Sequence, residues 1–271
     1  CLAGFTFAQD APLWMRHSVI SPDGTTIAFT YKGDIYTVPV AGGRAMQITT
    51  NPAYDTAPVW SPDSKRIAFA SDRMGSLDVY IVAKDGGEPR RLTTHSGSET
   101  PLAFTDAGHV LFSAGIMPSA EAVVFPSNGQ FNQVYRVSVE GGRPTMISSM
   151  PMECISINKE GAMLYQDKKG YEDYWRKHHV SPIARDIWMY TPGKEPQYRQ
   201  LTTFGGEDRE PVWAPDGKTF YYLSEENGSF NIYRRTPGDA KAVQLTHYTK
   251  NPVRYLSAAT DGRLCYGCLL Y

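Results

Sequence analysis

A short threonine-rich pattern recurs five times along the 271-residue chain, and it sets the architecture that the chain can adopt. The copies are Ile48-Thr49-Thr50, Leu92-Thr93-Thr94, Ile147-Ser148-Ser149, Leu201-Thr202-Thr203 and Leu245-Thr246-His247. Successive copies are separated by 44, 55, 54 and 44 residues. A period near 44, with two units lengthened by about ten residues, is typical of the blades of a β-propeller.

Two further echoes mark the strands within each unit. Turn sequences such as Ser21-Pro22-Asp23-Gly24 precede an apolar strand that ends in an aromatic residue, and a set that includes Asp34-Ile35-Tyr36 follows that strand. Pro, Asp and Gly favour tight turns, and β-branched and aromatic residues favour strands. One four-stranded unit cannot bury both of its faces alone, so neighbouring units are expected to pack around a ring.

The sequence therefore predicts an all-β fold, a six-bladed β-propeller of four-stranded antiparallel blades whose sixth blade is incomplete. The propeller is expected to span residues 9–271, with blades at about 17–50, 51–94, 95–149, 150–203, 204–247 and a partial 248–271.

Residues 1–8 read as the remnant of a secretory signal peptide. A short apolar run ends in Thr6-Phe7-Ala8, which places small residues before a cut after Ala8. This pattern predicts a periplasmic or secreted protein; an ordinary buried N-terminal strand is the alternative. No other stretch is apolar enough to be expected to span a membrane.

Composition narrows the function classes. The formal net charge of −1 argues against a nucleic-acid binder, which would need a basic face. Cys1, Cys154, Cys265 and Cys268 form no disulfide framework, and Cys265 and Cys268 make a lone C-x-x-C that favours two cysteines in a strand and its end. No metal or other cofactor is expected.

Several stretches resemble one protein family. Trp60-Ser61-Pro62-Asp63, the I-A-F-x-S-D-R-x-G run that begins at Ile67, and Asp78-Val79-Tyr80 resemble the TolB-like propeller repeat. Together with APLWMRHSVISPDG, RLTTHSGSETP, KGYEDYWRKHHVSPIARDIWMY and LTTFGGEDREPVWAPDGK, they resemble the N-terminal six-bladed propeller of bacterial tricorn-like serine proteases. After Gly267 the turn and acidic strand of that pattern are missing, so the chain reads as cut or frameshifted, that is, as a fragment.

The resemblance implies a role without catalysis. In that secreted or periplasmic family, a second propeller, a PDZ domain and a serine-protease core follow the first propeller, and the catalytic residues lie in that core. The chain is then expected to carry no active site and to scaffold or gate the access of peptides. Its partners would be peptides or other domains of the same protease, and an oligomer stays open. The alternatives are a stand-alone TolB-like protein-binding propeller and the propeller of a prolyl-oligopeptidase-type hydrolase.

The lengthened connection at residues 168–188 is predicted to dock on a neighbouring domain rather than to form an active site. Adjacent histidines point apart on a strand or a helix, and the H-E-x-x-H and G-x-S-x-G motifs are absent from the sequence. The aromatic and cationic side chains suited to docking are Tyr171, Tyr174, Trp175, Arg176, Lys177, His178, His179 and Arg185. Packing onto its own blade is the alternative. The apolar insertion at residues 115–131 is expected to pack against this neighbouring insertion of blade 4, and contact with a partner domain is its alternative.

Three acidic residues occupy matching places in the repeat. Counting five residues past Thr50, Thr94 and Thr203 gives Asp55, Glu99 and Asp208, each expected just before an innermost strand, in the loop that crosses from one blade to the next. Crossing loops of a propeller gather at one mouth of its central tunnel, so the three carboxylates form a candidate peptide-binding rim. In the alternative interpretation, each carboxylate caps a turn or accepts a hydrogen bond from a nearby backbone N–H.

Overall fold

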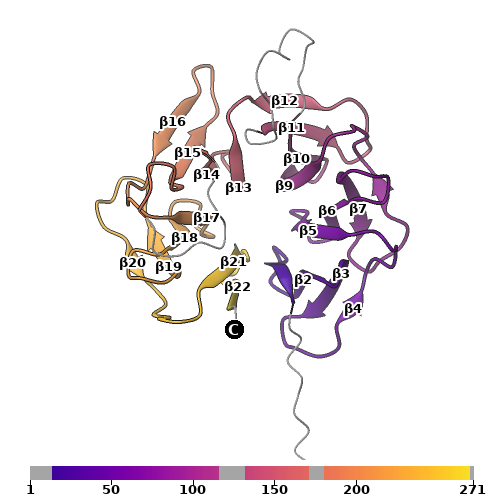
Figure 1. The fold of residues 1–271 in the computed structure, drawn as a ribbon, viewed down its shortest axis with the longest axis horizontal. Coiled ribbons are helices and arrows are strands. Elements are labelled where there is room, and N and C mark those ends of the chain that lie inside the picture. The colour runs from indigo at the N-terminus through magenta and orange to yellow at the C-terminus, as the bar shows by residue number, and fades with distance from the viewer. Residues whose placement is uncertain (1–13, 116–131, 171–179, 269–271) are drawn as a thin grey trace, which may run out of the picture.

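The structure, a computed structural model, describes residues 14–115, 132–170 and 180–268. These residues form 22 strands and no helix. The strands make five four-stranded sheets and one two-stranded sheet, all antiparallel, arranged in a ring (Figure 1). The predicted all-β propeller of four-stranded blades, with only two strands in the sixth unit of the described residues, is confirmed.

The strand bounds follow the repeat, and each blade runs from its innermost to its outermost strand in chain order. Blade 1 contains β1 (Arg16–Ile20), β2 (Thr26–Tyr31), β3 (Asp34–Pro39) and β4 (Met46–Gln47). Blade 2 contains β5 (Asp55–Trp60), β6 (Arg66–Ser71), β7 (Asp78–Ala83) and β8 (Arg90–Arg91). Blade 3 contains β9 (Glu99–Asp106), β10 (His109–Ala114), β11 (Gln133–Ser138) and β12 (Thr145–Ser148).

The second half of the ring repeats this order. Blade 4 contains β13 (Met152–Ile157), β14 (Met163–Asp167), β15 (Ile187–Thr191) and β16 (Gln197–Gln200). Blade 5 contains β17 (Asp208–Trp213), β18 (Phe220–Ser224), β19 (Asn231–Arg235) and β20 (Val243–Gln244). The sixth sheet contains β21 (Val253–Ala258) and β22 (Leu264–Cys268), and β22 holds both cysteines of the C-x-x-C. Only Arg16 lies before its expected blade range, while residues 1–8 lie outside the described residues.

The threonine-rich pattern lies at the end of the fourth strand, mostly outside it. In four blades it follows that strand directly, and in blade 3 it overlaps β12. The fourth strand itself is only two residues long in three blades. The sequence pattern suggests a fourth strand that contains these residues, and this prediction is wrong for most blades. The pattern instead marks the point where the fourth strand ends and the crossover to the next blade begins.

The core lies between the blades. Five clusters of buried apolar side chains each join two neighbouring blades; one of them packs Ile35 and Ile48 of blade 1 against Trp60 and Phe69 of blade 2. Within blades, the predicted aromatic residues of the second and third strands stand opposite each other, as in the pairs Phe29–Tyr36, Phe69–Tyr80, Phe112–Tyr135 and Tyr222–Tyr233, with ring centroids 5.6–5.9 Å apart. Burial of these faces drives the packing of blade on blade.

Hydrogen bonds join the sixth sheet to blade 1. The N–H of Ile20 donates to Ser257 Oγ at 3.1 Å, and the Thr260 hydroxyl donates to the carbonyl of Pro22 at 2.7 Å. Arg263 Nη1 donates to the carbonyl of Gly24 at 2.7 Å. The first and last sheets of the described residues therefore meet and close the ring.

The two ends of the propeller differ in their connections. Because the strands alternate in direction, the turns after the first and third strands of each blade share one end, which we call the hairpin end. The connections after the second strand and the crossings to the next blade share the other, which we call the crossover end. Both lengthened connections, residues 115–132 and 168–186, follow a second strand, as predicted, and so lie at the crossover end.

Candidate functional site

The three predicted rim carboxylates each begin the innermost strand of a blade. Asp55 is the first residue of β5, Glu99 of β9 and Asp208 of β17. All three are buried, with 0%, 1% and 1% of their surface exposed. A buried carboxylate requires a cation, a proton or hydrogen bonds, so the neighbours of each one decide what it can do.

A threonine hydroxyl ties the crossover to the third strand at four of the blade boundaries. The hydroxyl oxygen accepts the N–H of the residue that follows the start of the Asp/Asn-Ile-Tyr pattern; the pairs are Ile35–Thr49 at 3.0 Å, and Val79–Thr93, Ile187–Thr202 and Ile232–Thr246 at 2.9 Å. The hydroxyl of Thr49 in turn donates to Asp34 at 3.2 Å, and that of Thr246 donates to Asn231 at 3.0 Å. The two sequence patterns are therefore two halves of one hydrogen-bonded clamp.

At the boundary between blades 1 and 2, the buried carboxylate has its own cation. Arg73 Nη2 lies 3.1 and 3.0 Å from the two oxygens of Asp55. Arg73 Nε donates to Ser71 Oγ at 2.8 Å, and the guanidinium lies over the Tyr80 ring, 4.5 Å from its centroid. The S-D-R sequence that ends the second strand of blade 2 therefore supplies the counter-ion of the innermost strand of the same blade.

At the boundary between blades 2 and 3, two buried carboxyl groups share one cation. Arg91 Nη2 lies 2.9 Å from Asp78 Oδ2, whereas no hydrogen bond of good geometry reaches either carboxyl oxygen of Glu99. Burial raises the pKa of Glu99 to about 7; the Thr93 hydroxyl opposes this rise and the neighbouring Asp78 adds to it. Glu99 therefore keeps a proton to much higher pH than an exposed glutamate.

The boundary between blades 4 and 5 repeats this arrangement. Lys169 Nζ lies 2.5 Å from Asp186 Oδ2. Asp208 has hydrogen bonds from the hydroxyls of Ser224 and Thr202, and no cation among the described residues forms an ion pair with it. Burial raises the pKa of Asp208 to about 7. The hydroxyls of Ser224 and Thr202 oppose this rise, and the nearby charge of Asp186 adds to it. Its Oδ1 has no hydrogen-bond partner among the described residues.

Two further boundaries, between blades 3 and 4 and between blade 5 and the sixth sheet, carry neutral side chains at the start of the third strand and at the start of the next innermost strand. Gln133 and Met152 begin β11 and β13, and Asn231 and Val253 begin β19 and β21. Asn231 Oδ1 accepts the N–H of Tyr248 at 2.7 Å, which an amide oxygen does without any charge. At the start of β19, this structural contact is therefore made without any charge.

The burial of Asp55, Glu99 and Asp208 argues against an exposed acidic rim, and the partners described above are a guanidinium and hydroxyl groups rather than the backbone N–H of a turn. A buried carboxylate cannot meet a peptide amino group without an opening of the blade boundary, and each of the three is used between blades. The peptide-binding role of these residues stays a prediction.

Arg185 is the one predicted docking residue that lies within the described residues. It is buried, and its guanidinium lies 3.3 Å from both Glu153 and Glu207; Glu207 also accepts Arg209 Nε at 2.8 Å. Arg185 therefore ties its connection to blade 5 of the same propeller. Tyr171, Tyr174, Trp175, Arg176, Lys177, His178 and His179 lie outside the described residues, so their docking role stays a prediction.

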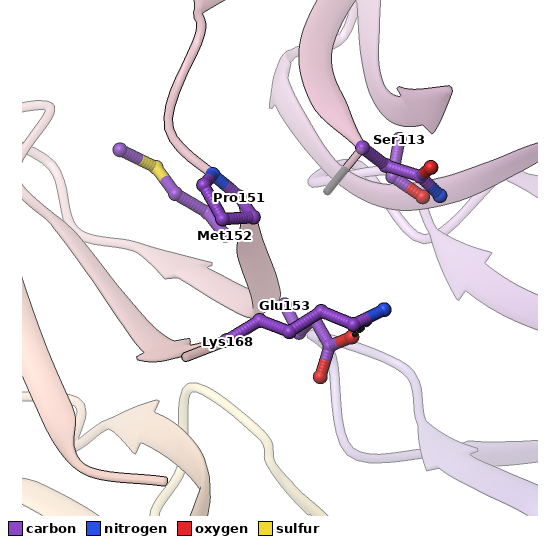
Figure 2. Close-up of a pocket in the computed structure, with 6 residues that line it drawn as sticks. Ser113, Pro151, Met152, Glu153 and Lys168 are labelled. Carbon is purple, nitrogen blue, oxygen red and sulfur yellow. Dashed lines mark ion pairs between the residues drawn. The ribbon is translucent and has the colours of Figure 1, made fainter. Parts of the chain in front are cut away.

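A small hollow lies beside this ion-pair network, between blades 3 and 4. Figure 2 shows Lys168 next to Glu153, with Pro151 and Met152 on one side and Ser113 across from them. Lys168 Nζ is 3.4 Å from Glu153 Oε1, and Arg185 and Lys168 outweigh the effect of burial and hold the pKa of Glu153 below its usual value. Both charges of the hollow are thus already compensated.

The innermost strands contain a bulge that sequence reasoning did not predict. In five of these strands a non-glycine residue near the start has a left-handed φ of 50–58°. It is the second residue of β1, His17, and the third residue of the other four strands, Ala57, Cys154, Glu210 and Tyr255. In blade 3 the same place is Pro101, which cannot adopt a positive φ. A left-handed residue in a bulge has no marker in the sequence unless it is glycine or asparagine.

Bulge residues of neighbouring strands contact each other on the inner side of the ring. The rings of His17 and Tyr255 are 5.2 Å apart, and the Thr56 hydroxyl lies 3.2 Å from His17 Nδ1. Burial, with a smaller effect from Arg16, lowers the pKa of His17 to about 4, so this imidazole is neutral at pH 7. No acid–base pair with an adjacent nucleophile results from these contacts.

Two classes of site find no support in the described residues. Across residues 14–115, 132–170 and 180–268, no three His, Cys, Asp or Glu side chains gather in a way that could hold a metal ion. Within the same ranges, no helix has the length and apolar character needed to cross a membrane.

The fold and its boundaries define a β-propeller module held together by repeated side-chain clamps. Residues 12–269 match the family described as the tricorn protease N-terminal beta propeller domain, and the chain belongs to this family.

Individual relatives agree with this assignment. The chain is 25% identical over 254 residues to "Tricorn protease homolog 1" of Streptomyces coelicolor, which covers 93% of this chain and 22% of that protein. It is similar in fold to the crystal structure of the tricorn protease, with a TM-score of 0.76 and 19% identity over 95% of this chain and 24% of that one. A putative TolB from Agrobacterium tumefaciens has a TM-score of 0.71 and 15% identity, over 96% of this chain and 92% of that one. The chain thus spans less than a quarter of the tricorn proteins that it matches.

Proposed function

We propose that this propeller is a non-catalytic module of a secreted or periplasmic tricorn-like protease. It scaffolds the protease or gates the access of peptides to a serine-protease core elsewhere in the polypeptide. The observation that carries the proposal is the family match over residues 12–269, combined with an inner surface whose charged side chains are engaged in holding blades together. The small-residue pattern at Thr6-Phe7-Ala8 supports export.

The crossover end is the surface that we propose docks on the rest of the protease. Large apolar side chains are exposed there in the connections, at Tyr54, Met74, Met150, Val180 and Tyr248. At the hairpin end, the described turns themselves expose no large apolar side chain, but Met46 and Val243 are exposed where β4 and β20 leave their turns, so the exposed apolar residues are more numerous at the crossover end. Exposed apolar area gathered at one end of a molecule is typical of an interaction surface.

The first test concerns chemistry. The purified 271-residue chain is incubated with a diverse peptide pool, and cleavage is followed by mass spectrometry. No turnover is expected. Sequence-specific cleavage that survives repurification and disappears in a single variant such as Ser181→Ala would contradict the proposal.

The second test concerns docking. The propeller and the rest of the protease are expressed separately, and their association is measured by analytical ultracentrifugation. Met74→Lys combined with Tyr54→Lys is expected to weaken the association at least about tenfold, because charge in an apolar contact is costly. The matched control is Asp85→Lys in a hairpin turn, which should change nothing. Equal association of both variants would place the contact elsewhere.

A further inference from the structure

The boundary between blades 2 and 3 holds an uneven set of charges in a buried place. Asp78, at the start of β7, and Glu99, at the start of β9, have 0% and 1% of their surface exposed. Arg91, on β8, lies 2.9 Å from Asp78 and is the cation of the pair. Two carboxyl groups therefore face one guanidinium.

The other elements packed against β9 bring no spare charge to Glu99. The only acid of β5 is Asp55, which Arg73 neutralises. On β13, Glu153 is bound to Lys168 and Arg185. The residue opposite Glu99 on β10 is the uncharged Ala114, and the nearest group of the crossover is the hydroxyl of Thr93.

Glu99 also makes a backbone contact that joins the two blades. Its N–H donates to the carbonyl of Leu77, directly before β7, at 2.6 Å. The backbone of Glu99 thus bonds to Leu77 and its side chain lies near Asp78, the next residue of blade 2. A charge that develops on the Glu99 side chain acts directly on this joint, because nothing but protein surrounds it.

We propose that Glu99 keeps its proton in the folded protein while the neighbouring Asp78 stays ionised against Arg91, and that loss of the Glu99 proton loosens the joint between blades 2 and 3. With the proton, one carboxylate faces one guanidinium and the set is neutral. Without it, two carboxylates repel each other in a buried place, and water must enter to solvate the second charge. The boundaries with Gln133 and Met152, or with Asn231 and Val253, contain no such group and are insensitive to pH at these positions.

The elevated proton affinity of Glu99 fits this device and fixes its direction. Burial raises its pKa from the ordinary 4.5 to about 7. Below pH 4.5 the carboxyl is protonated in both the folded and unfolded chain. Between 4.5 and 7 the unfolded chain releases the proton and the folded chain keeps it, so stability falls as the pH rises. Above about pH 7 the folded chain has lost the proton too, and the joint is loose.

Hydrogen exchange followed by mass spectrometry tests the device at peptide resolution. Wild type, Glu99→Gln and the control Glu88→Gln are compared at pH 5.5 and pH 8.5, with rates corrected for the intrinsic pH dependence of exchange. Glu88 is an exposed acid in a hairpin turn of blade 2, on the other side of the same joint. In wild type and in Glu88→Gln, exchange of residues 77–80 and 99–102 is expected to rise about tenfold or more at pH 8.5. In Glu99→Gln it should stay as slow as at pH 5.5.

A second variant tests whether the negative charge of Asp78, in addition to burial, raises the proton affinity of Glu99. Asp78→Asn removes the like charge, so the pH at which the joint loosens should move downward relative to wild type. Identical pH profiles in wild type and Glu99→Gln would overturn the proposal. So would a pH-dependent rise in exchange that is spread evenly over all blades, or an unchanged midpoint in Asp78→Asn.

Discussion

Replacement of Arg73 by Leu leaves Asp55 buried without its counter-ion. The Arg73 side chain is itself only 12% exposed, and it contributes two contacts to Asp55, one to Ser71 and a cation–π contact with Tyr80. Removal of one partner of a buried ion pair costs about 3–5 kcal/mol. Since water reaches one side of the guanidinium, we expect the lower end, about 3 kcal/mol.

Urea unfolding followed by circular dichroism measures this loss, and thermal melts give a second reading. For a domain of this size, about 1 kcal/mol corresponds to about 2–4 °C, so Arg73→Leu should lower the melting temperature by about 6–12 °C. The double variant Arg73→Leu with Asp55→Asn removes the stranded charge. It should regain all but about 1 kcal/mol, because an uncharged amide at position 55 can still accept hydrogen bonds without leaving a buried charge unpaired.

The matched control is Arg44→Leu, which removes an exposed arginine from a hairpin turn of blade 1. It should change stability by less than about 0.5 kcal/mol. If the single Arg73 variant loses no more than this control, or if the double variant is no more stable than the single one, Asp55 and Arg73 are not the coupled pair argued above.

Two other substitutions test neighbouring features. Ala57→Gly relieves a left-handed φ of 51° and should stabilise the fold by about 0.5–1 kcal/mol, whereas the control Ala68→Gly on the next strand should destabilise it by about 1 kcal/mol in the same urea titration; a loss in both variants would argue against strain at the bulge. Asp208→Asn removes a carboxyl group whose pKa is raised by burial from 3.8 to about 7. The wild type should therefore lose stability relative to the variant as the pH rises from about 4 to 7. Thermal melts at pH 4, 5.5 and 8 check this, and a constant difference in melting temperature between the two proteins would contradict it.

Much of the fold is predictable from the sequence because each blade repeats the same local requirements. The spacing of Ile48, Leu92, Ile147, Leu201 and Leu245 places all five four-stranded blades, since four antiparallel strands and their turns need a similar length of chain in each blade. From the sequence alone, the threonine pattern predicts part of a fourth strand. Its hydroxyl bond to the third strand instead bends the chain into the crossover, which only the side-chain geometry reveals.

The charge state of the strand-start acids depends on contacts that the local sequence does not specify. Asp55, Glu99 and Asp208 occupy one repeat position, yet only Asp55 meets an arginine, which lies 18 residues further on. Their matching positions in the repeat predict matching positions along the backbone, and all three do lie at the beginning of an innermost strand. Exposure depends on the neighbouring blade, and for that reason the same pattern could not tell a rim from a buried clamp.

The two boundaries with protonated acids enclose one part of the ring. Glu99 lies between blades 2 and 3, and Asp208 lies between blades 4 and 5, so the pair of blades 3 and 4 has a pH-sensitive joint on each side. The boundary inside this pair, with Gln133 and Met152, carries no charge at these positions. Blades 3 and 4 also carry both lengthened connections at the crossover end. A rise in pH through 7 therefore acts on the two edges of the segment that bears these connections and leaves its interior unchanged.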